Sequence, residues 1–153
     1  MERDTLSETE LWFKKAFPTP QSKNVHTQLG VHFEEVREMI LELDSTDPTT
    51  RQMLTLAKDH LHNLANWLKA SDKVVHIKHG RRTAFLDAMC DQIVTGTGVM
   101  HMFGMNSCDA MKEVNKSNFS KFENGKVLYD DNLKVIKGKD FFKPQLAPFA
   151  NKS

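Results

Sequence analysis

The amino-acid sequence predicts an all-α protein, a bundle of about five helices with a short C-terminal β-hairpin and an extended tail. Apolar residues recur at helical spacing through most of the first 120 positions. Capping residues, prolines and glycines divide this part into helix-length segments, and strand-like text with turn signals occurs only near the end. The length of 153 residues fits a single domain over residues 1–153, with a helical core over 1–123 and the hairpin and tail over 124–153.

The first two helices follow from a capping signal and an apolar stripe. Ser7 and Glu10 match a capping box, which opens a helix through Phe17 that Pro18 stops. A second helix is expected from about His26. Its stripe consists of Leu29, Phe33, Val36, Ile40 and Leu43.

The third and fourth helices are separated by a polar connection. Asp47 is a favourable N-cap and Pro48 a favourable first residue for a helix that ends near Ala70. After the connection over 71–82, a fourth helix is expected over 83–103, and the glycine that follows ends it.

The last elements are shorter. Asn106 or Ser107 caps a fifth, amphipathic helix. Turn signals then flank two strand-like segments, 126–129 and 133–136, which predict a small hairpin. The tail over 141–149 is expected to be extended and limited by prolines.

Composition excludes several classes of protein. Hydrophobic residues make up 39%, charged residues 27%, and the mean hydropathy is -0.50, which excludes a disordered chain and a membrane bundle. The net charge of +1 argues against binding to a nucleic-acid polymer or a membrane surface. Without an apolar leader, a cytoplasmic location is expected. Cys90 and Cys108 are expected to be buried reduced thiols.

The small net charge hides an uneven distribution. Residues 1–50 hold 5 Lys and Arg against 10 Asp and Glu, whereas residues 112–153 hold 9 against 5. An acidic N-terminal part and a basic C-terminal part suit a protein that holds a metal ion at one place and phosphates at another. Solvated helix faces sorted in this way are the alternative.

The second helix carries a cluster of acidic residues beside its apolar stripe. Glu34, Glu38 and Glu42 form one ridge, and Glu35 lies one turn before Glu38. Like charges at these spacings repel unless a cation neutralises them. The cluster therefore predicts a cation site or, alternatively, an exposed acidic face.

The fourth helix places two more carboxylates in an apolar segment. Asp87 and Asp91 are one turn apart, and their apolar neighbours predict partial burial. Two helices that present oxygen ligands suit Mg²⁺ or Mn²⁺. A salt-bridge network is the alternative, although the bases close by in the sequence are only Arg37, Arg81 and Arg82.

These residues resemble the motifs of the all-α nucleoside triphosphate pyrophosphohydrolases, the MazG-like superfamily that includes phosphoribosyl-ATP pyrophosphohydrolase and the dimeric dUTPases. The segment Glu34-Glu35-x-x-Glu38 looks like the family's EExxE motif, and Asp91 looks like the end of its ExxD motif. The preceding acid, Asp87, stands four residues before Asp91 rather than three. The closest likeness is to stand-alone phage and bacterial members.

A downstream segment adds to the resemblance. Residues 113–122, EVNKSNFSKF, are similar to the Asn and Lys-Phe segment that family members use on the triphosphate. The resemblance therefore covers about residues 11–122 with three motifs in the family's order.

The resemblance implies hydrolysis of a (deoxy)nucleoside triphosphate to the monophosphate and pyrophosphate with Mg²⁺ or Mn²⁺, with dGTP or dATP in phage metabolism as one form. It implies a homodimer or homotetramer. Implied catalytic residues are Glu34, Glu35 and Glu38. Implied metal ligands are Glu35, Glu38, Asp87 and Asp91. Implied triphosphate contacts are Asn115, Lys116, Asn118 and Lys121.

Base recognition is less defined by the sequence. Trp12 and Gln28 precede the first motif and offer a ring and an amide for a base. Phosphoribosyl-ATP or dUTP is the alternative substrate. A helical nucleotide-binding module without catalysis is the alternative of another class.

Overall fold

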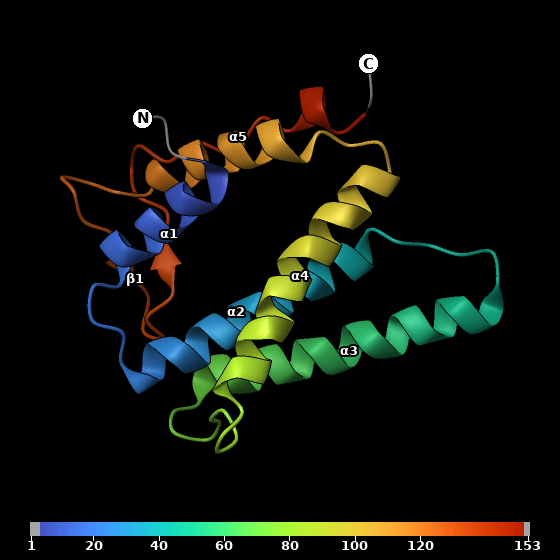
Figure 1. The fold of residues 1–153 in the computed structure, drawn as a ribbon, viewed down its shortest axis with the longest axis horizontal. Coiled ribbons are helices and arrows are strands. Elements are labelled where there is room, and N and C mark those ends of the chain that lie inside the picture. Colours follow the sequence, from blue (N-terminus) through green and yellow to red (C-terminus); the bar gives the residue numbers. More distant parts are fainter. Residues whose placement is uncertain (1–3, 152–153) are drawn as a thin grey trace. The chain divides into compact units, whose positions relative to one another are not determined.

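The structure, a computed structural model, describes residues 4–151 and is mostly helical (Figure 1). The helices and strands, in chain order, are α1 (Thr5–Ala16), α2 (Ser22–Leu41), α3 (Pro48–Ala70), α4 (Arg82–Met102), α5 (Ser107–Phe119), β1 (Leu128–Tyr129), β2 (Val135–Ile136) and the short 3₁₀ helix η1 (Ala147–Phe149). The two strands pair with each other in one small sheet. This architecture confirms the predicted all-α fold class with a C-terminal hairpin.

The chain divides into two compact units. One, the α2–α3 unit, consists of residues 19–76 and 129–134. The other, the α1–α5 unit, contains α1, α4, α5, part of the hairpin and the tail. A single domain over residues 1–153 was predicted, and within the described residues the structure packs as two units.

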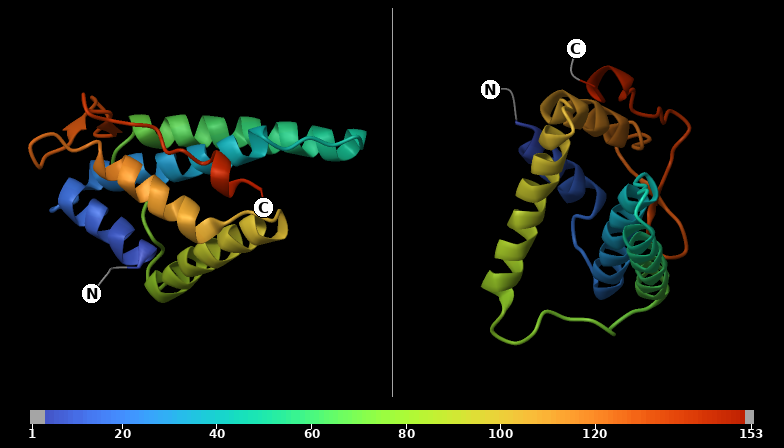
Figure 2. Two further views of the ribbon diagram at one scale, coloured as in Figure 1. Left: turned by 90° about the horizontal axis from the view of Figure 1, so that it is seen from above. Right: turned by 90° about the vertical axis from the view of Figure 1, so that its right-hand side faces the viewer.

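In the α2–α3 unit, the two long helices lie side by side and run in opposite directions (Figures 1 and 2). Gly30 of α2 sets their separation. A Cβ atom at this position would lie 2.6 Å from Cγ of Lys69 and 2.7 Å from the carbonyl oxygen of Ala65. Because both distances are shorter than any real Cβ contact, only glycine allows α3 to approach this closely.

In the α1–α5 unit, the two named helices pack through aromatic rings. Trp12 and Ala16 of α1 are buried with Val127, and Phe119 and Phe122 pack against them. The Trp12 and Phe122 rings meet edge to face with centroids 6.1 Å apart, a favourable arrangement for aromatic pairs. This cluster is the hydrophobic core of the unit.

The C-terminal tail is bound along α5 by backbone groups. The Ser117 hydroxyl donates to the carbonyl of Phe142 at 2.8 Å, and the Phe142 amide donates to the Ser120 hydroxyl at 3.1 Å. Further along, the Asn106 amide donates to the carbonyl of Phe149 at 2.9 Å. The tail is extended, as predicted, but ends in η1.

Two helix starts differ from the sequence prediction. Helix α1 is capped by Asp4, whose carboxylate accepts from the Ser7 amide at 2.8 Å, so Ser7 does not open the helix. Helix α2 begins at Ser22 rather than near His26, because the Gln21 backbone amide donates to the Asn24 side-chain oxygen at 2.8 Å and caps the helix there. The predicted caps of α3 and α5 agree with the structure.

Candidate functional site

The acidic residues of the predicted first motif lie in the middle of α2. Glu35 and Glu38 are exposed, one turn apart, whereas Glu34 is half-buried. The rigid helix therefore presents two carboxylates to solvent and directs the third into the α2–α3 unit.

Glu34 is held by two lysines that come from distant parts of the chain. The Lys69 ammonium donates to its Oε1 at 2.8 Å, and the Lys134 ammonium donates to its Oε2 at 2.9 Å. Burial raises the pKa of Glu34, but these hydrogen bonds and the two positive charges outweigh it and lower that pKa below the ordinary value. Glu34 is consequently a weak base in this environment.

These two lysines are the partners that the sequence reasoning missed. It considered only bases near the acids in the sequence, such as Arg37, whose Nε is buried without a hydrogen-bond partner among the described groups. Lys69 was recoverable, because a short loop between two long helices brings the end of the second beside the start of the first. Lys134, 100 residues from Glu34, has no such local signal.

Asp87 and Asp91 lie one turn apart on α4, in the α1–α5 unit. Both are exposed, and within α4, which the structure describes in full, no residue is buried. The expectation that apolar neighbours would bury these carboxylates is therefore wrong for this chain, since the neighbours are themselves exposed. Cys90 and Cys108, expected to be buried, are exposed as well.

Metal-binding capacity is divided between the two units. Across residues 4–151, no three His, Cys, Asp or Glu side chains are grouped so that they would hold an ion. The candidate carboxylate ligands occur as pairs: Glu35 with Glu38 on α2, and Asp87 with Asp91 on α4. Carboxylate oxygens are the ligands that Mg²⁺ and Mn²⁺ prefer, so the chemistry of each pair fits such a cation, and each pair supplies two side chains.

The candidate triphosphate residues of α5 differ in their surroundings. Asn115 is 2% exposed, accepts from the Thr9 hydroxyl at 2.9 Å, and donates to the carbonyl of Thr5 at 2.9 Å. Its amide thereby joins α5 to α1. Lys116, the next residue, is exposed.

Three of the predicted residues contact one another in the α1–α5 unit. The Lys121 ammonium donates to the Asn118 side chain at 2.9 Å and lies 5.7 Å from the centroid of the Trp12 ring system, a cation–π contact. The Trp12 indole donates to the carbonyl of Asn118 at 2.8 Å. Trp12 is buried in the core, while Gln28 of α2 is exposed.

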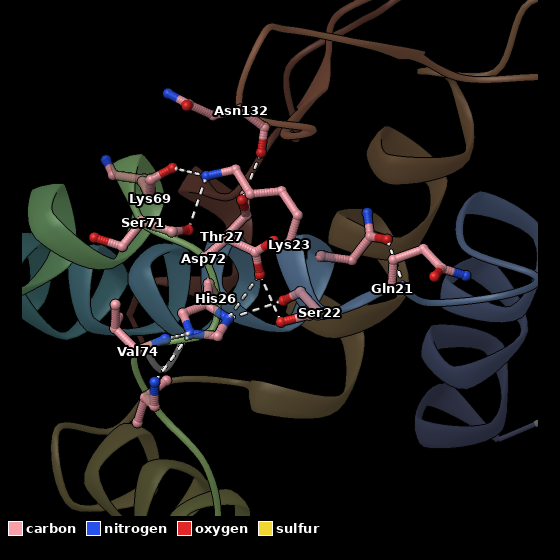
Figure 3. A network of polar contacts seen from close by, with 12 residues as sticks. Gln21, Ser22, Lys23, His26, Thr27, Lys69, Ser71, Asp72, Val74 and Asn132 are labelled. Carbon is pink, nitrogen blue, oxygen red and sulfur yellow. Dashed lines mark hydrogen bonds and ion pairs between the residues drawn. The ribbon is translucent and has the colours of Figure 1, made fainter.

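A polar network surrounds the first turns of α2 (Figure 3). Its centre is His26, which is only 1% exposed and bonds through both ring nitrogens. Nearby, the Thr27 hydroxyl donates to the carbonyl of Asn132. The network therefore ties α2 to the residues after α3 and to the turn over 129–134.

Comparison with family models, curated proteins and solved structures gave no match. Along the part of the chain that the structure describes, no helix combines the length and apolarity needed to span a membrane.

Proposed function

We propose that the chain is a divalent-metal-dependent pyrophosphohydrolase of nucleoside triphosphates that acts in the cytoplasm, the host's if it is phage-encoded. The observation that carries the proposal is the arrangement of the EExxE-like segment. Lys69 and Lys134 hold Glu34, which leaves Glu35 and Glu38 on the exposed face of a rigid helix. A purely solvating acidic face would not require one of its carboxylates to be clamped by two lysines.

The proposed metal ligands are two pairs of carboxylates, Glu35 with Glu38 on α2 and Asp87 with Asp91 on α4. When bound, Mg²⁺ or Mn²⁺ would supply charge neutralisation for triphosphate oxygens and a water of lowered pKa. Glu38 is the proposed base rather than Glu34, because Lys69 and Lys134 lower the pKa of Glu34 and make it the weaker base. Glu34 is the positioning residue that fixes the orientation of the acidic helix.

The proposed triphosphate contacts come from α5. Lys116 is exposed and provides a positive charge for phosphate oxygens. Lys121 and Asn118 would turn from each other toward the substrate, whereas Asn115 keeps α5 in place through its bonds to α1. Gln28, exposed on α2, remains a proposed base contact, with dGTP or dATP as candidate substrates, whereas Trp12, predicted for the same role, is a core residue of the α1–α5 unit.

A second copy of the chain is the proposed partner, as a homodimer or homotetramer. Helix α4 is apolar on most of its surface, and its Leu86 and Ile93 side chains are 63% and 53% exposed. Large uncovered apolar areas of this kind mark association surfaces. These two residues are seven positions apart, so they lie on one face of α4, and the charged residue on that face is Arg82, one turn before Leu86 in the first turn of the helix.

The purified full-length chain should release pyrophosphate from at least one nucleotide in the presence of Mg²⁺ or Mn²⁺. The panel holds the common ribo- and deoxyribonucleoside triphosphates, dUTP and phosphoribosyl-ATP, so the same assay identifies the base and the alternative substrates. Release from no member of the panel with either metal would contradict the proposal and favour a non-catalytic nucleotide-binding module.

The Glu38→Gln variant tests the assignment of the site. It should lower turnover by about 100-fold or more, because removal of a metal ligand or base costs at least that much. Glu42→Gln is the matched control, since Glu42 follows α2 directly, one turn after Glu38, and is exposed. Equal turnover in the Glu38→Gln variant and the wild type would overturn the assignment, provided both have the same helical circular dichroism.

A further inference from the structure

The buried ring of His26 has a defined arrangement of donors and acceptors. Its Nε2 lies 3.0 Å from the Val74 amide and 3.1 Å from the Val75 amide. Both of these groups are donors, so Nε2 accepts and carries no proton. The single ring proton is therefore on Nδ1, which lies 2.9 Å from the carbonyl of Ser22 and donates to it.

The two amides belong to the linker between α3 and α4, residues 71–81, whose first residues lie in the α2–α3 unit. Val74 and Val75 have exposed side chains, so apolar burial does not hold this part of the linker. Lys73 has a φ of 57°, a left-handed conformation that a lysine rarely adopts. The bonds to His26 therefore hold a segment that has little else to fix it (Figure 3).

A second contact holds the start of the linker without depending on Nε2. The Ser22 hydroxyl donates to the Asp72 carboxylate at 2.6 Å, and Lys23 donates to the carbonyls of Lys69 and Ser71. The Ser22 hydrogen bond lowers the pKa of Asp72, and the backbone amide and the charge of Lys73 lower it further against the effect of burial. Asp72 consequently stays ionised throughout the range in which histidines titrate.

A second proton would bind Nε2, and the resulting imidazolium would interact with the charged groups on the segments around the ring. They are Asp72, Lys73 and, once protonated, His76 of the linker, Lys23 of α2, Lys69 of α3, and Asp130, Asp131 and Lys134 of the turn. The Asp72 carboxylate lies 3.9 Å from Nδ1, on the side of the ring away from the two amides. An imidazolium would thus keep its interaction with Asp72 while its new Nε2–H pointed at two other N–H donors.

We propose that His26 is a proton-sensitive anchor of the α3–α4 linker. The neutral ring accepts from Val74 and Val75 and holds the linker on α2. Uptake of one proton from solvent at Nε2 converts the acceptor into a donor, which breaks both amide bonds and releases residues 74 and 75. The Asp72 and Lys23 contacts stay in place, so the release is confined to the part of the linker that continues toward α4.

Nuclear magnetic resonance of the full-length chain tests this directly. Long-range proton–nitrogen spectra report which nitrogen of His26 carries the proton, and amide exchange reports the protection of Val74 and Val75. From about pH 8 to about pH 5, the protection of these two amides, corrected for intrinsic exchange, should fall by about tenfold or more, while that of Ala65 and Leu68 is retained. A neutral ring with its proton on Nε2, or unchanged protection across this range, would overturn the proposal.

Two variants separate the anchor from a general effect of acid. His26→Gln keeps an acceptor that does not titrate, so the pH dependence of the Val74 and Val75 amides should disappear. His79→Gln, an exposed residue of the same linker, should leave it as in the wild type. If the His26→Gln variant does not fold, the wild-type tautomer and the His79→Gln comparison still decide the question. The same pH dependence in the His26→Gln variant would refute it.

Discussion

Helices α2 and α4 are of similar length, yet their surroundings differ. In α2, the residues His26, Thr27 and Gly30 are buried, whereas α4 has no buried residue. The glycines show the same contrast. A Cβ at Gly30 would collide with α3, while a Cβ at Gly96 would meet nothing within 4 Å. A helix with clear amphipathic spacing is covered within its own unit, and one that is apolar on most sides is not.

The difference teaches that the two helices use their apolar residues for different purposes. Helix α2 joins a narrow apolar stripe to polar contacts that come from α3, the linker and the turn over 129–134. Helix α4 contacts α5 near its end and leaves Leu86, Ile93 and Met102 mostly exposed. The stripe of α2 builds a unit, whereas the apolar side chains of α4 are largely uncovered, which is why we propose them as the contact with a second copy.

The largest effect is expected from charges placed on the exposed face of α4. If a second copy covers Leu86 and Ile93, the double substitution Leu86→Glu, Ile93→Glu should abolish association, because burial of two unpaired carboxylates costs several kcal/mol. Light scattering should then give the mass of one chain, 17.5 kDa, in place of a multiple of it.

Val99→Glu is the control for this substitution, since Val99 lies on roughly the opposite side of α4 and is also exposed. It should retain the mass of the wild type. If the wild-type chain is monomeric at all concentrations, the proposal that the exposed face of α4 contacts a second copy is wrong.

An alanine at the two glycines should change stability in opposite directions. Gly30→Ala should lower the free energy of unfolding by about 1–3 kcal/mol, because the added Cβ forces α2 and α3 apart. Gly96→Ala should raise it by up to about 1 kcal/mol, because alanine favours a helix and the space is open. Urea unfolding measures both, and changes of the same sign would break the comparison.

Local chemistry decided how much of the fold the sequence could predict. Helix caps depend only on residues within one turn of the helix start. Helix α3 starts after Asp47 with Pro48, and α5 starts after Asn106, so both were predicted with their observed starts. The start of α2 was missed because its cap is an amide pair, Gln21 and Asn24, that is less common than serine or aspartate.

The candidate site was less predictable, because its contacts join distant residues. The pattern of carboxylates on α2 was visible in the sequence, but the bond from Lys134 to Glu34 depends on how the turn over 129–134 reaches α2. The exposure of Asp87 was not visible either, since apolar neighbours predict burial only when another element covers them. Periodicity describes one helix and does not identify its partner.

An effect smaller than that of Gly30→Ala is expected from the clamp that distinguishes α2, the hydrogen bonds of Lys69 and Lys134 to Glu34. Glu34→Gln should lower the free energy of unfolding near pH 7 by about 1–2 kcal/mol, because the charge-assisted bonds from Lys69 and Lys134 are lost. The pKa of Glu34 is lowered in the folded chain, so its contribution is complete above the unfolded value and is lost as the pH falls through the folded one. The difference between wild type and variant should therefore shrink in acid. The control Glu42→Gln should change the free energy of unfolding by less than about 0.5 kcal/mol at every pH. If the difference between wild type and Glu34→Gln stays constant into acid, the charge of Glu34 does not stabilise its contacts with Lys69 and Lys134.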